Sequence, residues 1–327
     1  MGTRISRWIL LGWISVWLVA ASGEVAWAAP VDQQGPVPRT GARAAVVIDD
    51  STGAVLYGDR AFDELPPASL TKMVTALVAL ERGTLDQRVE PQGDYDVEPI
   101  LIGIGVGDSL RLEDALYGLL LNSGNDAGLA IAESVGQGSI PRFVGWMNQL
   151  VRRLGLSHTR FLNPHGLDQS GHVSSAYDMA IIGRALMRQP TLARIVGERR
   201  RLIEGPPRWL FQTTNLLLGS YPGADGIKTG YDTLAGRCLV GTAVRDGRRA
   251  IAVVMNSDRY VRDTAALLDA AFDDPSWMRQ PESSASARSV HVPVGVLRAD
   301  LEGVGGAEKR SVYRVRRGDL SPREFRG

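Results

Sequence analysis

The chain has 327 residues, and its 37 basic and 36 acidic side chains leave a formal net charge of +1. With 44% hydrophobic and 22% charged residues, the composition excludes a disordered or collagen-like protein. The balanced charge, without a basic block that carries interleaved aromatic residues, argues against nucleic-acid binding. The length predicts about two domains, or one large domain with a small appendage. Only three of the basic residues are lysines, namely Lys72, Lys228 and Lys309.

The N-terminal segment has the three parts of a secretory signal. Arg4 and Arg7 give it a positive start, sixteen uncharged and mostly apolar residues follow, and the small side chains of Ala26 and Ala28 mark a cleavage site. Sixteen residues are fewer than the roughly 20 that a membrane-spanning helix needs. We therefore predict that residues 1–28 are a signal peptide, and that the protein is exported to the periplasm or cell-wall space without a strong membrane anchor.

A proline- and glycine-rich stretch over residues 29–41 predicts a linker. Two short apolar runs follow, 44–48 and 54–57, on either side of a turn that contains Asp, Ser and Gly, and this pattern predicts a β-hairpin. Between Leu70 and Leu80 the apolar residues recur at helical spacing. Ser69 is therefore predicted to lie at or just inside the start of a helix.

The middle of the chain has the apolar periodicity of helices, and its end returns to strands. The predicted helices cover residues 110–121, 127–135, 143–154 and 177–187. Two valine-rich runs, 238–244 and 250–255, surround an Arg-Asp-Gly-Arg turn and predict a hairpin, after which residues 259–272 predict a closing helix. Strands at both ends predict an α/β fold, in which an antiparallel sheet is flanked by helices and an all-helical subdomain is inserted.

We expect the main domain to cover residues 42–274. Residues 275–327 show no pattern able to build a core, so we expect a short C-terminal extension with no clear domain. The single cysteine, Cys238, permits no intrachain disulfide, and its apolar surroundings in the sequence predict a buried and inert thiol.

Ser69 and Lys72 form an S-x-x-K motif. Residues three apart on a helix share one face, about 5–6 Å apart at Cβ, so the hydroxyl and the amine can meet. Serine becomes a good nucleophile when a neighbour removes its proton, which lysine can do only in its neutral form. Lowering a lysine pKa from about 10.4 to near 7 takes about 4 to 5 kcal/mol, which burial or a nearby cation can supply. Alone, the motif is more typical of a helix-capping serine and a solvated lysine.

Ser123 and Asn125 form an S-x-N motif that interrupts two helical patterns. It is therefore predicted to lie at the tip of a turn. The serine could pass a proton to a leaving group, and the asparagine could both donate to and accept from a substrate amide. Alone, the motif is typical of an ordinary turn between helices.

Lys228, Thr229 and Gly230 form a K-T-G motif. Threonine and lysine can hold a carboxylate, and glycine leaves room for an extended substrate against the backbone. A strand edge at this position could accept a peptide as an additional strand. Alone, the motif is typical of the end of a surface strand.

Together the motifs occur in the order that is typical of penicillin-binding proteins and class A β-lactamases. Two of the three lysines fall inside them. The matching stretches are PPASLTKMVTALVAL, LNSGNDA, NPHGLDQSGHVSSAYDMAIIGRAL, YPGADGIKTGYDTLAGRCLVGTA and VVMNSDR. Over roughly residues 42–272 the chain resembles the low-molecular-mass penicillin-binding proteins that are serine-type D-alanyl-D-alanine carboxypeptidases. The resemblance implies a β-lactamase/transpeptidase-like fold and a catalytic domain over residues 42–274, with no cofactor and no metal.

By this resemblance, Ser69 would attack the carbonyl between two D-alanines and carry the acyl group, with Lys72 as its general base. Ser123 would relay a proton to the departing D-alanine. The backbone N–H groups of Ser69 and Tyr231 would form the oxyanion hole. The implied ligands are peptidoglycan stem peptides that end in D-Ala-D-Ala, and β-lactam antibiotics that acylate the same serine.

The resemblance also implies how the substrate is held. Asn125 would hold the acyl-side amide, and Thr229 would bind the terminal carboxylate. Lys228 would attract that carboxylate and lower the pKa of the catalytic amine. An arginine beyond the last strand would help to hold the carboxylate, and Arg262 is the candidate, with Arg259 as a nearby rival.

Four alternatives remain open. A class A β-lactamase would need a glutamate near Thr159, and residues 156–167 contain none. A peptidoglycan endopeptidase would use the same motifs, and a non-catalytic peptidoglycan-binding module would not need them intact. A metalloenzyme would use three histidines spaced by seven residues with an aspartate between them, although turn-stabilising polar residues explain the pattern better; these residues are His158, His165, Asp168 and His172.

Overall fold

The computed structural model describes residues 38–95, 97, 99–205 and 207–274. The predicted signal peptide, most of the predicted linker and the predicted C-terminal extension lie outside the described residues. Among the helices that are described, none is both long and apolar enough to cross a membrane.

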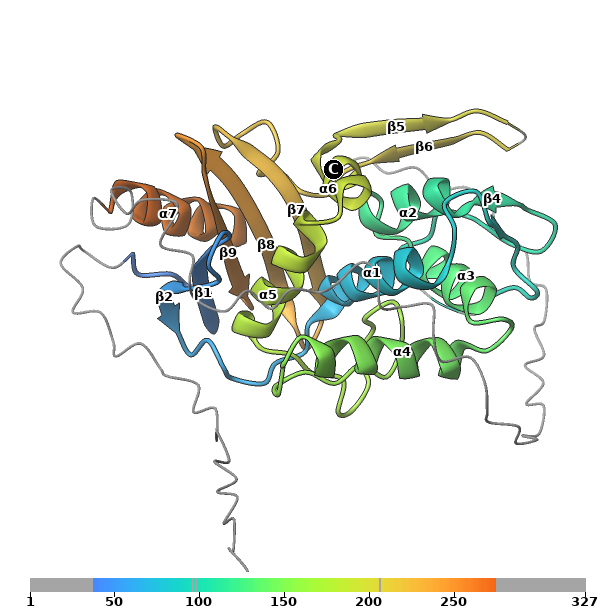
Figure 1. The fold of residues 1–327 in the computed structure, drawn as a ribbon, viewed down its shortest axis with the longest axis horizontal. Coiled ribbons are helices and arrows are strands. Elements are labelled where there is room, and N and C mark those ends of the chain that lie inside the picture. The colour runs from blue at the N-terminus through green and yellow to red at the C-terminus, as the bar shows by residue number, and fades with distance from the viewer. Residues whose placement is uncertain (1–37, 96, 98, 206, 275–327) are drawn as a thin grey trace, which may run out of the picture. The chain divides into compact units, whose positions relative to one another are not determined.

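The described residues build a five-stranded sheet with the order β2-β1-β9-β8-β7, in which all neighbouring strands are antiparallel (Figure 1). The strands are β1 (Ala44–Asp49), β2 (Val55–Asp59), β7 (Ala224–Asp232), β8 (Gly236–Arg245) and β9 (Arg248–Met255). The N-terminal hairpin joins the sheet through β1, whose Val46 lies opposite Val253 of β9. This confirms the predicted antiparallel sheet that is assembled from both ends of the chain.

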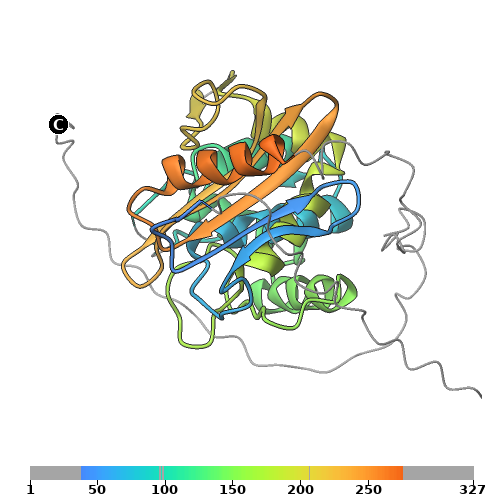
Figure 2. The same ribbon diagram turned by 90° about the vertical axis from the view of Figure 1, so that its left-hand side faces the viewer.

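Alternate side chains of the strands enter two separate cores, as the two-residue period of a strand requires. On one face Val47 and Val254 pack with helix α7 (Tyr260–Asp273), which lies across the sheet in Figure 2. On the other face Val46 and Val253 pack with the remaining helices. Because both faces are covered, β8 and β9 have continuous apolar sequences instead of alternating ones.

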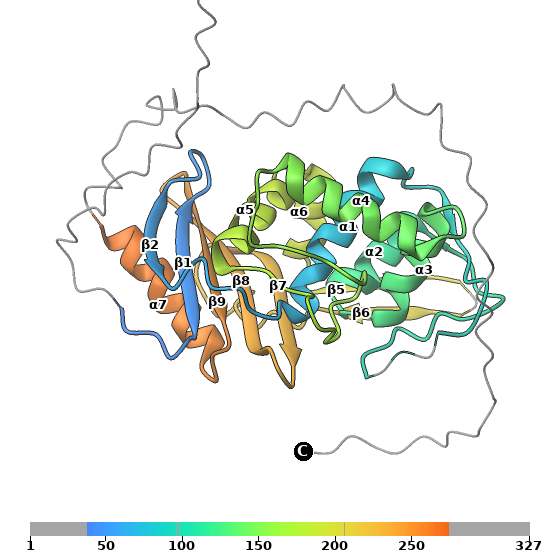
Figure 3. The same ribbon diagram turned by 90° about the horizontal axis from the view of Figure 1, so that it is seen from below.

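Within the described residues, six further helices and one 3₁₀ turn lie on the second face and beyond the β7 edge. They are η1 (Ala68–Thr71), α1 (Lys72–Arg82), α2 (Leu112–Leu120), α3 (Asn125–Val135), α4 (Ile140–Arg153), α5 (Ala176–Met187) and α6 (Pro190–Gly197). Helix α1 is central, and its residues from Lys72 to Ala79 are all buried. Helices α2, α3 and α4 pack around it on the side away from β1 (Figure 3). This group confirms the predicted helical subdomain.

The predicted helix over residues 110–121 begins later than expected, at Leu112. Leu110 and Arg111 instead form a short strand, β4, which pairs with β3 (Arg88–Val89). The polar-apolar pattern alone could not reveal this pairing, because the partner strand is only two residues long.

A second two-stranded sheet, β5 (Arg200–Ile203) with β6 (Trp209–Gln212), was not predicted. Leu202 lies opposite Leu210 in this hairpin, and these side chains are 47% and 63% exposed. Burial alternates along β6, but one exposed position carries a leucine, so the sequence lacks the polar-apolar alternation that identifies a half-buried strand.

Cys238, on β8, is fully buried. Burial raises the pKa of its thiol to about 11, so the thiol remains protonated at neutral pH. The structure therefore confirms the predicted buried thiol.

Candidate active site

Ser69 and Lys72 lie where η1 passes into α1, close to the edge strand β7. The Lys72 side chain is fully buried, and its Nζ donates to Ser69 Oγ at 2.8 Å. The same Nζ donates to Asn125 Oδ1 and to the backbone oxygen of His165, both at 2.7 Å. All of these partners are neutral oxygens, so no carboxylate is hydrogen-bonded to the amine; Asp126 and Asp232 act on it only at longer range.

Burial lowers the pKa of Lys72 well below its ordinary value, and the positive charge of Lys228 lowers it further. Burial also lowers the pKa of Lys228, to about 7. The sequence named burial and a nearby cation as possible causes of a lowered lysine pKa without ranking them, and the structure makes burial the larger cause. The reason is that α1 is enclosed by other helices along its length, which the motif could not show.

Ser123 lies in the turn between α2 and α3, with a positive backbone φ of 64°. A non-glycine residue in this region is uncommon and costs conformational energy. Its Oγ accepts a hydrogen bond from Lys228 Nζ at 3.0 Å. Through Ser123 the S-x-N motif therefore contacts Lys228 of the K-T-G motif. Through Asn125, at the start of α3, it contacts Lys72.

An acidic residue that the sequence did not single out holds the loop beside this turn. The buried carboxylate of Asp126 accepts hydrogen bonds from the backbone N–H groups of Ile102, Gly103 and Ile104, at 2.8 to 3.1 Å. Gly124 lies so close to this loop that an added Cβ would be 2.7 Å from Ile102 Cγ2. The only feature of the sequence that could have pointed to Asp126 is its position directly after Asn125 of the S-x-N motif.

The K-T-G motif lies on β7, which is the edge strand of the sheet. Lys228 is 1% exposed, and its Nζ also donates to the backbone oxygen of Thr229 at 2.9 Å. A Cβ on Gly230 would lie 3.1 Å from the backbone oxygen of Pro67. Glycine at this position therefore also lets η1, which carries Ser69, pack closely against β7.

The loop over residues 161–175 supports η1 from the other side. An added Cβ on Gly166, which has a φ of 94°, would lie 2.0 Å from the backbone oxygen of Ala68. Thr75 Oγ1 donates to the backbone oxygen of Pro164 at 2.6 Å. These contacts fix the position of the His165 backbone oxygen, which accepts a hydrogen bond from Lys72. The family resemblance had assigned no role to this oxygen.

Two of the three histidines stabilise the same loop. His172 Nδ1 accepts from the backbone N–H of Leu162 at 3.1 Å, so its Nε2 carries the proton and donates to Thr71 Oγ1 at 2.8 Å. Burial lowers the pKa of His172 to about 4 and that of His165 to about 3. His158 lies elsewhere, 3.8 Å from a carboxylate oxygen of Glu64. Within the described residues, no group of three His, Cys, Asp or Glu side chains is arranged to hold a metal ion.

The two remaining predicted residues lie at different places. Tyr231, at the end of β7, is 64% exposed. Arg262 is exposed on α7, which packs mainly on β8 and β9. A different arginine, Arg237, lies opposite Tyr231 in the β7–β8 register, and its guanidinium is 5.8 Å from the Tyr231 ring. The sequence did not identify Arg237, because cross-strand neighbours are visible only once the register is known.

The sequence also did not predict that Thr214 lies beside the K-T-G motif, with its Oγ1 2.5 Å from Thr229 Oγ1. Thr214 belongs to the segment that leads from β6 to β7, and its backbone N–H donates to the oxygen of Leu121. This segment therefore forms a wall beside the K-T-G motif.

The chain matches known proteins over the same region. The family Peptidase_S11, described as D-alanyl-D-alanine carboxypeptidase, matches residues 32–259. D-alanyl-D-alanine carboxypeptidase DacF of Bacillus subtilis is 37% identical over 243 residues, which are 71% of this chain and 62% of DacF. This chain therefore spans less than two thirds of the length of that relative.

Solved structures agree with the sequence matches. The D-alanyl-D-alanine carboxypeptidase of Mycobacterium tuberculosis has a TM-score of 0.69 and 35% identity, covering 73% of this chain and 93% of that one. Penicillin-binding protein D2 of Listeria monocytogenes, in its ampicillin-bound form, has a TM-score of 0.65 and 28% identity, covering 72% of this chain and 100% of that one.

Proposed function

The chain belongs to the Peptidase_S11 family of D-alanyl-D-alanine carboxypeptidases, and from this premise we propose that it removes the terminal D-alanine from peptidoglycan stem peptides through an acyl-enzyme. The observation that carries the proposal is the pair of buried amines, each bonded to a serine hydroxyl. Lys72 bonds to Ser69, and Lys228 bonds to Ser123.

In the acylation step, Lys72 in its neutral form removes the proton of Ser69. The Oγ of Ser69 then forms a bond with the carbonyl carbon of the penultimate D-alanine. Burial favours this role because it makes the uncharged amine accessible near neutral pH. We assign the oxyanion hole to the backbone N–H groups of Ser69 and Tyr231, which would stabilise the charge that develops on the carbonyl oxygen.

The C–N bond to the terminal D-alanine breaks next, and the departing nitrogen needs a proton. We assign its delivery to Ser123, which lies 3.0 Å from Lys228 Nζ. The proton that Lys72 took from Ser69 replaces the one that Ser123 gives away. Water then cleaves the ester, with Lys72 again acting as the base, and the shortened peptide leaves.

Substrate binding is assigned to the remaining motif residues. The side-chain carbonyl of Asn125 accepts from Lys72, so its amide N–H group is the donor for the acyl-side carbonyl of the substrate. Thr229 and Lys228 hold the terminal carboxylate, with Arg262 as a further candidate. An extended peptide would lie along the β7 edge, next to Gly230.

We expect β-lactams to inhibit the enzyme by acylating Ser69 at the same site. The Listeria penicillin-binding protein to which this chain is similar was solved with ampicillin. Residues 156–167 contain no glutamate that could activate a deacylating water as in class A β-lactamases, so we expect slow release of the penicilloyl group. Rapid turnover of benzylpenicillin would contradict this assignment.

The decisive experiment is mass spectrometry of muropeptides after incubation with the enzyme. A carboxypeptidase removes one alanine from a pentapeptide stem, whereas an endopeptidase converts cross-linked dimers to monomers. The control is the Ser69→Ala variant, which should do neither. Absence of both products with the unmodified enzyme, together with no labelling of Ser69 by a fluorescent penicillin, would favour a non-catalytic binding module.

We also propose that the protein is exported, with residues 1–28 as a cleaved signal peptide. The substrate lies outside the cytoplasm, which is consistent with this location. The intact mass of the protein recovered from the cell envelope tests the proposal. A mass that includes residues 1–28 would instead indicate an uncleaved anchor.

A further inference from the structure

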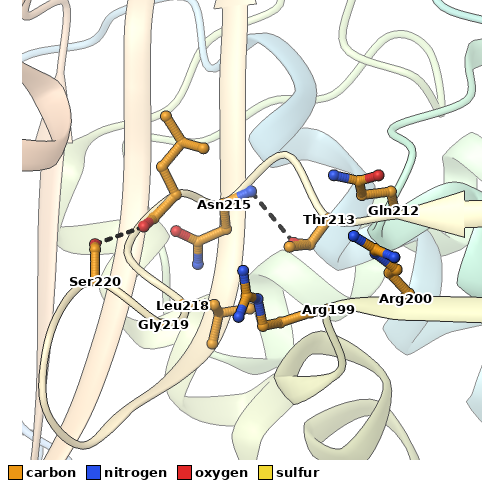
Figure 4. A pocket seen from close by; sticks show the side chains of 9 residues that line it. Arg199, Arg200, Gln212, Thr213, Asn215, Leu218, Gly219 and Ser220 are labelled. Atoms are coloured by element: carbon orange, nitrogen blue, oxygen red, sulfur yellow. Dashed lines mark hydrogen bonds between the residues drawn. The ribbon is translucent and has the colours of Figure 1, made fainter.

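A cavity of about 190 Å³ lies between the base of the β5–β6 hairpin and the segment that leads to β7 (Figure 4). It is separate from the Ser69–Lys72 pair, and its lining contains none of the motif residues. Its polar lining residues are Arg199, Arg200, Gln212, Thr213, Asn215 and Ser220. Two guanidinium groups and no acidic side chain from the described residues line it, so the cavity is electropositive.

Asn215 provides the strongest sign that the cavity receives a ligand. Its side chain is 2% exposed, and its Nδ2 has no hydrogen-bond partner among the described residues. Its Oδ1 is already used, since it accepts from the backbone N–H of Leu217 at 3.0 Å. A buried donor without a partner destabilises the folded protein, so a ligand that accepts from this N–H would recover the lost free energy.

The arginines also lack a protein counter-charge. No carboxylate of the described residues lies within 4.0 Å of the guanidinium of Arg199 or Arg200. Figure 4 shows the guanidinium of Arg199 near the amide of Asn215, while Arg200 lies farther away, beside Gln212. Gly219 permits this arrangement, because a Cβ at that position would lie 3.0 Å from Arg199 Nη1.

Hydrogen-bond donors therefore outnumber acceptors at this cavity. Thr213 Oγ1 accepts from the backbone N–H of Asn215 at 3.2 Å, which leaves its own hydroxyl proton to donate. Guanidinium, amide and hydroxyl donors together suit a planar carboxylate or a phosphate, because charge-assisted hydrogen bonds to oxyanions are the strongest that these groups make.

The wall of the cavity is also a wall of the catalytic site. Thr213 and Asn215 line the cavity, while Thr214, between them, reaches Thr229 Oγ1 at 2.5 Å. The side chains alternate as they do along an extended segment. An occupant that bonds to Thr213 and Asn215 would therefore restrain the residue that orients Thr229.

We propose that this cavity binds a small oxyanion, either a carboxylate of the peptidoglycan peptide or a free phosphate, and that its occupation holds the Thr213–Asn215 segment in place beside Thr229. The binding site stands on the geometry of the cavity alone. Its effect on catalysis rests on the proposed carboxypeptidase function.

Isothermal titration calorimetry with inorganic phosphate and with acetate tests the binding site without requiring any activity. We expect one site per chain. The Asn215→Asp variant keeps the Oδ1 that accepts from Leu217 but replaces the donor by a negative charge, and it should weaken binding by about tenfold or more. Arg199→Gln, a substitution at an exposed side chain, should weaken it similarly and guards against a folding defect in the first variant.

The matched control is Arg208→Gln. Arg208 lies in the same hairpin region and pairs with Glu204 outside the cavity, at 2.7 Å. Its replacement should leave phosphate and acetate binding unchanged. No binding by the unmodified protein, or equal binding by all four proteins, would overturn the proposal.

The source of the oxyanion is distinguished with two D-Ala-D-Ala pentapeptides that differ only in a free or an amidated D-glutamyl carboxylate. If the substrate supplies the oxyanion, the amidated peptide has the higher KM, and Arg199→Gln removes the difference. If free phosphate is the occupant, the peptides behave alike, and added phosphate changes KM in the unmodified enzyme but not in Arg199→Gln. No cleavage of either peptide would reject the proposed function while leaving the calorimetric result intact.

Discussion

Beside β7 the protein buries two lysine amines, Lys72 and Lys228, whereas on α7 it buries a carboxylate, Asp263. Asp263 accepts from Ser257 Oγ at 2.6 Å and from the backbone N–H of Gly41 at 2.9 Å, and Arg259 lies 3.7 Å away. The lysines bond only to neutral oxygens, and no carboxylate of the described residues lies within 4.0 Å of either Nζ.

The buried ionisable groups of the two regions therefore have different roles, one structural and one catalytic. A buried charge with hydrogen bonds and an opposite charge is retained as part of the packed structure, whereas a buried charge without a counter-charge shifts its pKa. The lysines have lowered pKa values, which suits proton transfer near neutral pH. The α7 face should therefore determine stability, and the β7 edge should determine activity at some cost in stability.

The largest expected effect is on the rate of acylation. Lys72→Arg should lower it by about 1,000-fold, because a guanidinium cannot lose its proton near neutral pH and so cannot act as the base. Stopped-flow labelling with a fluorescent penicillin measures the rate. Lys309→Arg, outside the described residues, is the control and should be silent. A normal rate in Lys72→Arg would show that the central assignment is wrong.

On the other side of the comparison, Asp263→Ala should lower the free energy of unfolding by about 3 kcal/mol, since it leaves the Ser257 hydroxyl and the Gly41 N–H unsatisfied. Denaturant titration measures this change. The folded variant should acylate at the normal rate. Lost acylation in a fully folded Asp263→Ala protein would contradict the separation of the two regions.

In contrast to Asp263→Ala, Lys228→Met should raise the free energy of unfolding by about 1–2 kcal/mol at neutral pH and abolish activity. The pKa of Lys228 falls from 10.5 in the unfolded chain to about 7 in the folded protein. Between these values the unfolded state binds more protons, so the stability of the unmodified protein rises with pH. The gain in the variant should thus be largest at or below pH 7 and disappear towards pH 10.5. A loss of stability at pH 7 would refute this account.

A smaller effect is expected from a substitution that distinguishes burial from the charge of Lys228 as causes of the low pKa of Lys72. Lys228→Gln removes a positive charge, so the pKa of Lys72 should rise and the acidic limb of the pH–acylation profile should move to higher pH. The limb should still lie well below the ordinary lysine pKa, because burial is the larger cause. An unmoved limb would mean that the two amines are not coupled.

The smallest effect is expected at the rim of the site. Arg262→Gln should raise KM for D-Ala-D-Ala peptides by less than about tenfold, since an exposed charge is worth at most about 1 kcal/mol. Parallel measurements on Arg237→Gln decide which arginine holds the carboxylate. A KM effect confined to Arg237→Gln would replace Arg262 in the assignment.

The sequence was enough to predict the family, the β1–β2 and β8–β9 hairpins, most of the helices, and the three motifs. It could do so because these features depend on short-range spacing. The i, i+3 relation places Ser69 beside Lys72, and the valine-rich runs around a turn form the β8–β9 hairpin.

Contacts between groups far apart in the sequence became visible only in the folded structure. Lys72 reaches Asn125 and the backbone oxygen of His165, 53 and 93 residues away, and Lys228 reaches Ser123 across 105 residues. The lowered pKa values depend on this enclosure, because desolvation requires several distant elements to exclude water together. Thr214 and Asn215 could not be identified from the sequence either, because Thr229 and the cavity arginines beside them are distant in the chain. Whether a lysine in a motif is solvated or is a buried base is therefore decided by packing, which a spacing pattern does not contain.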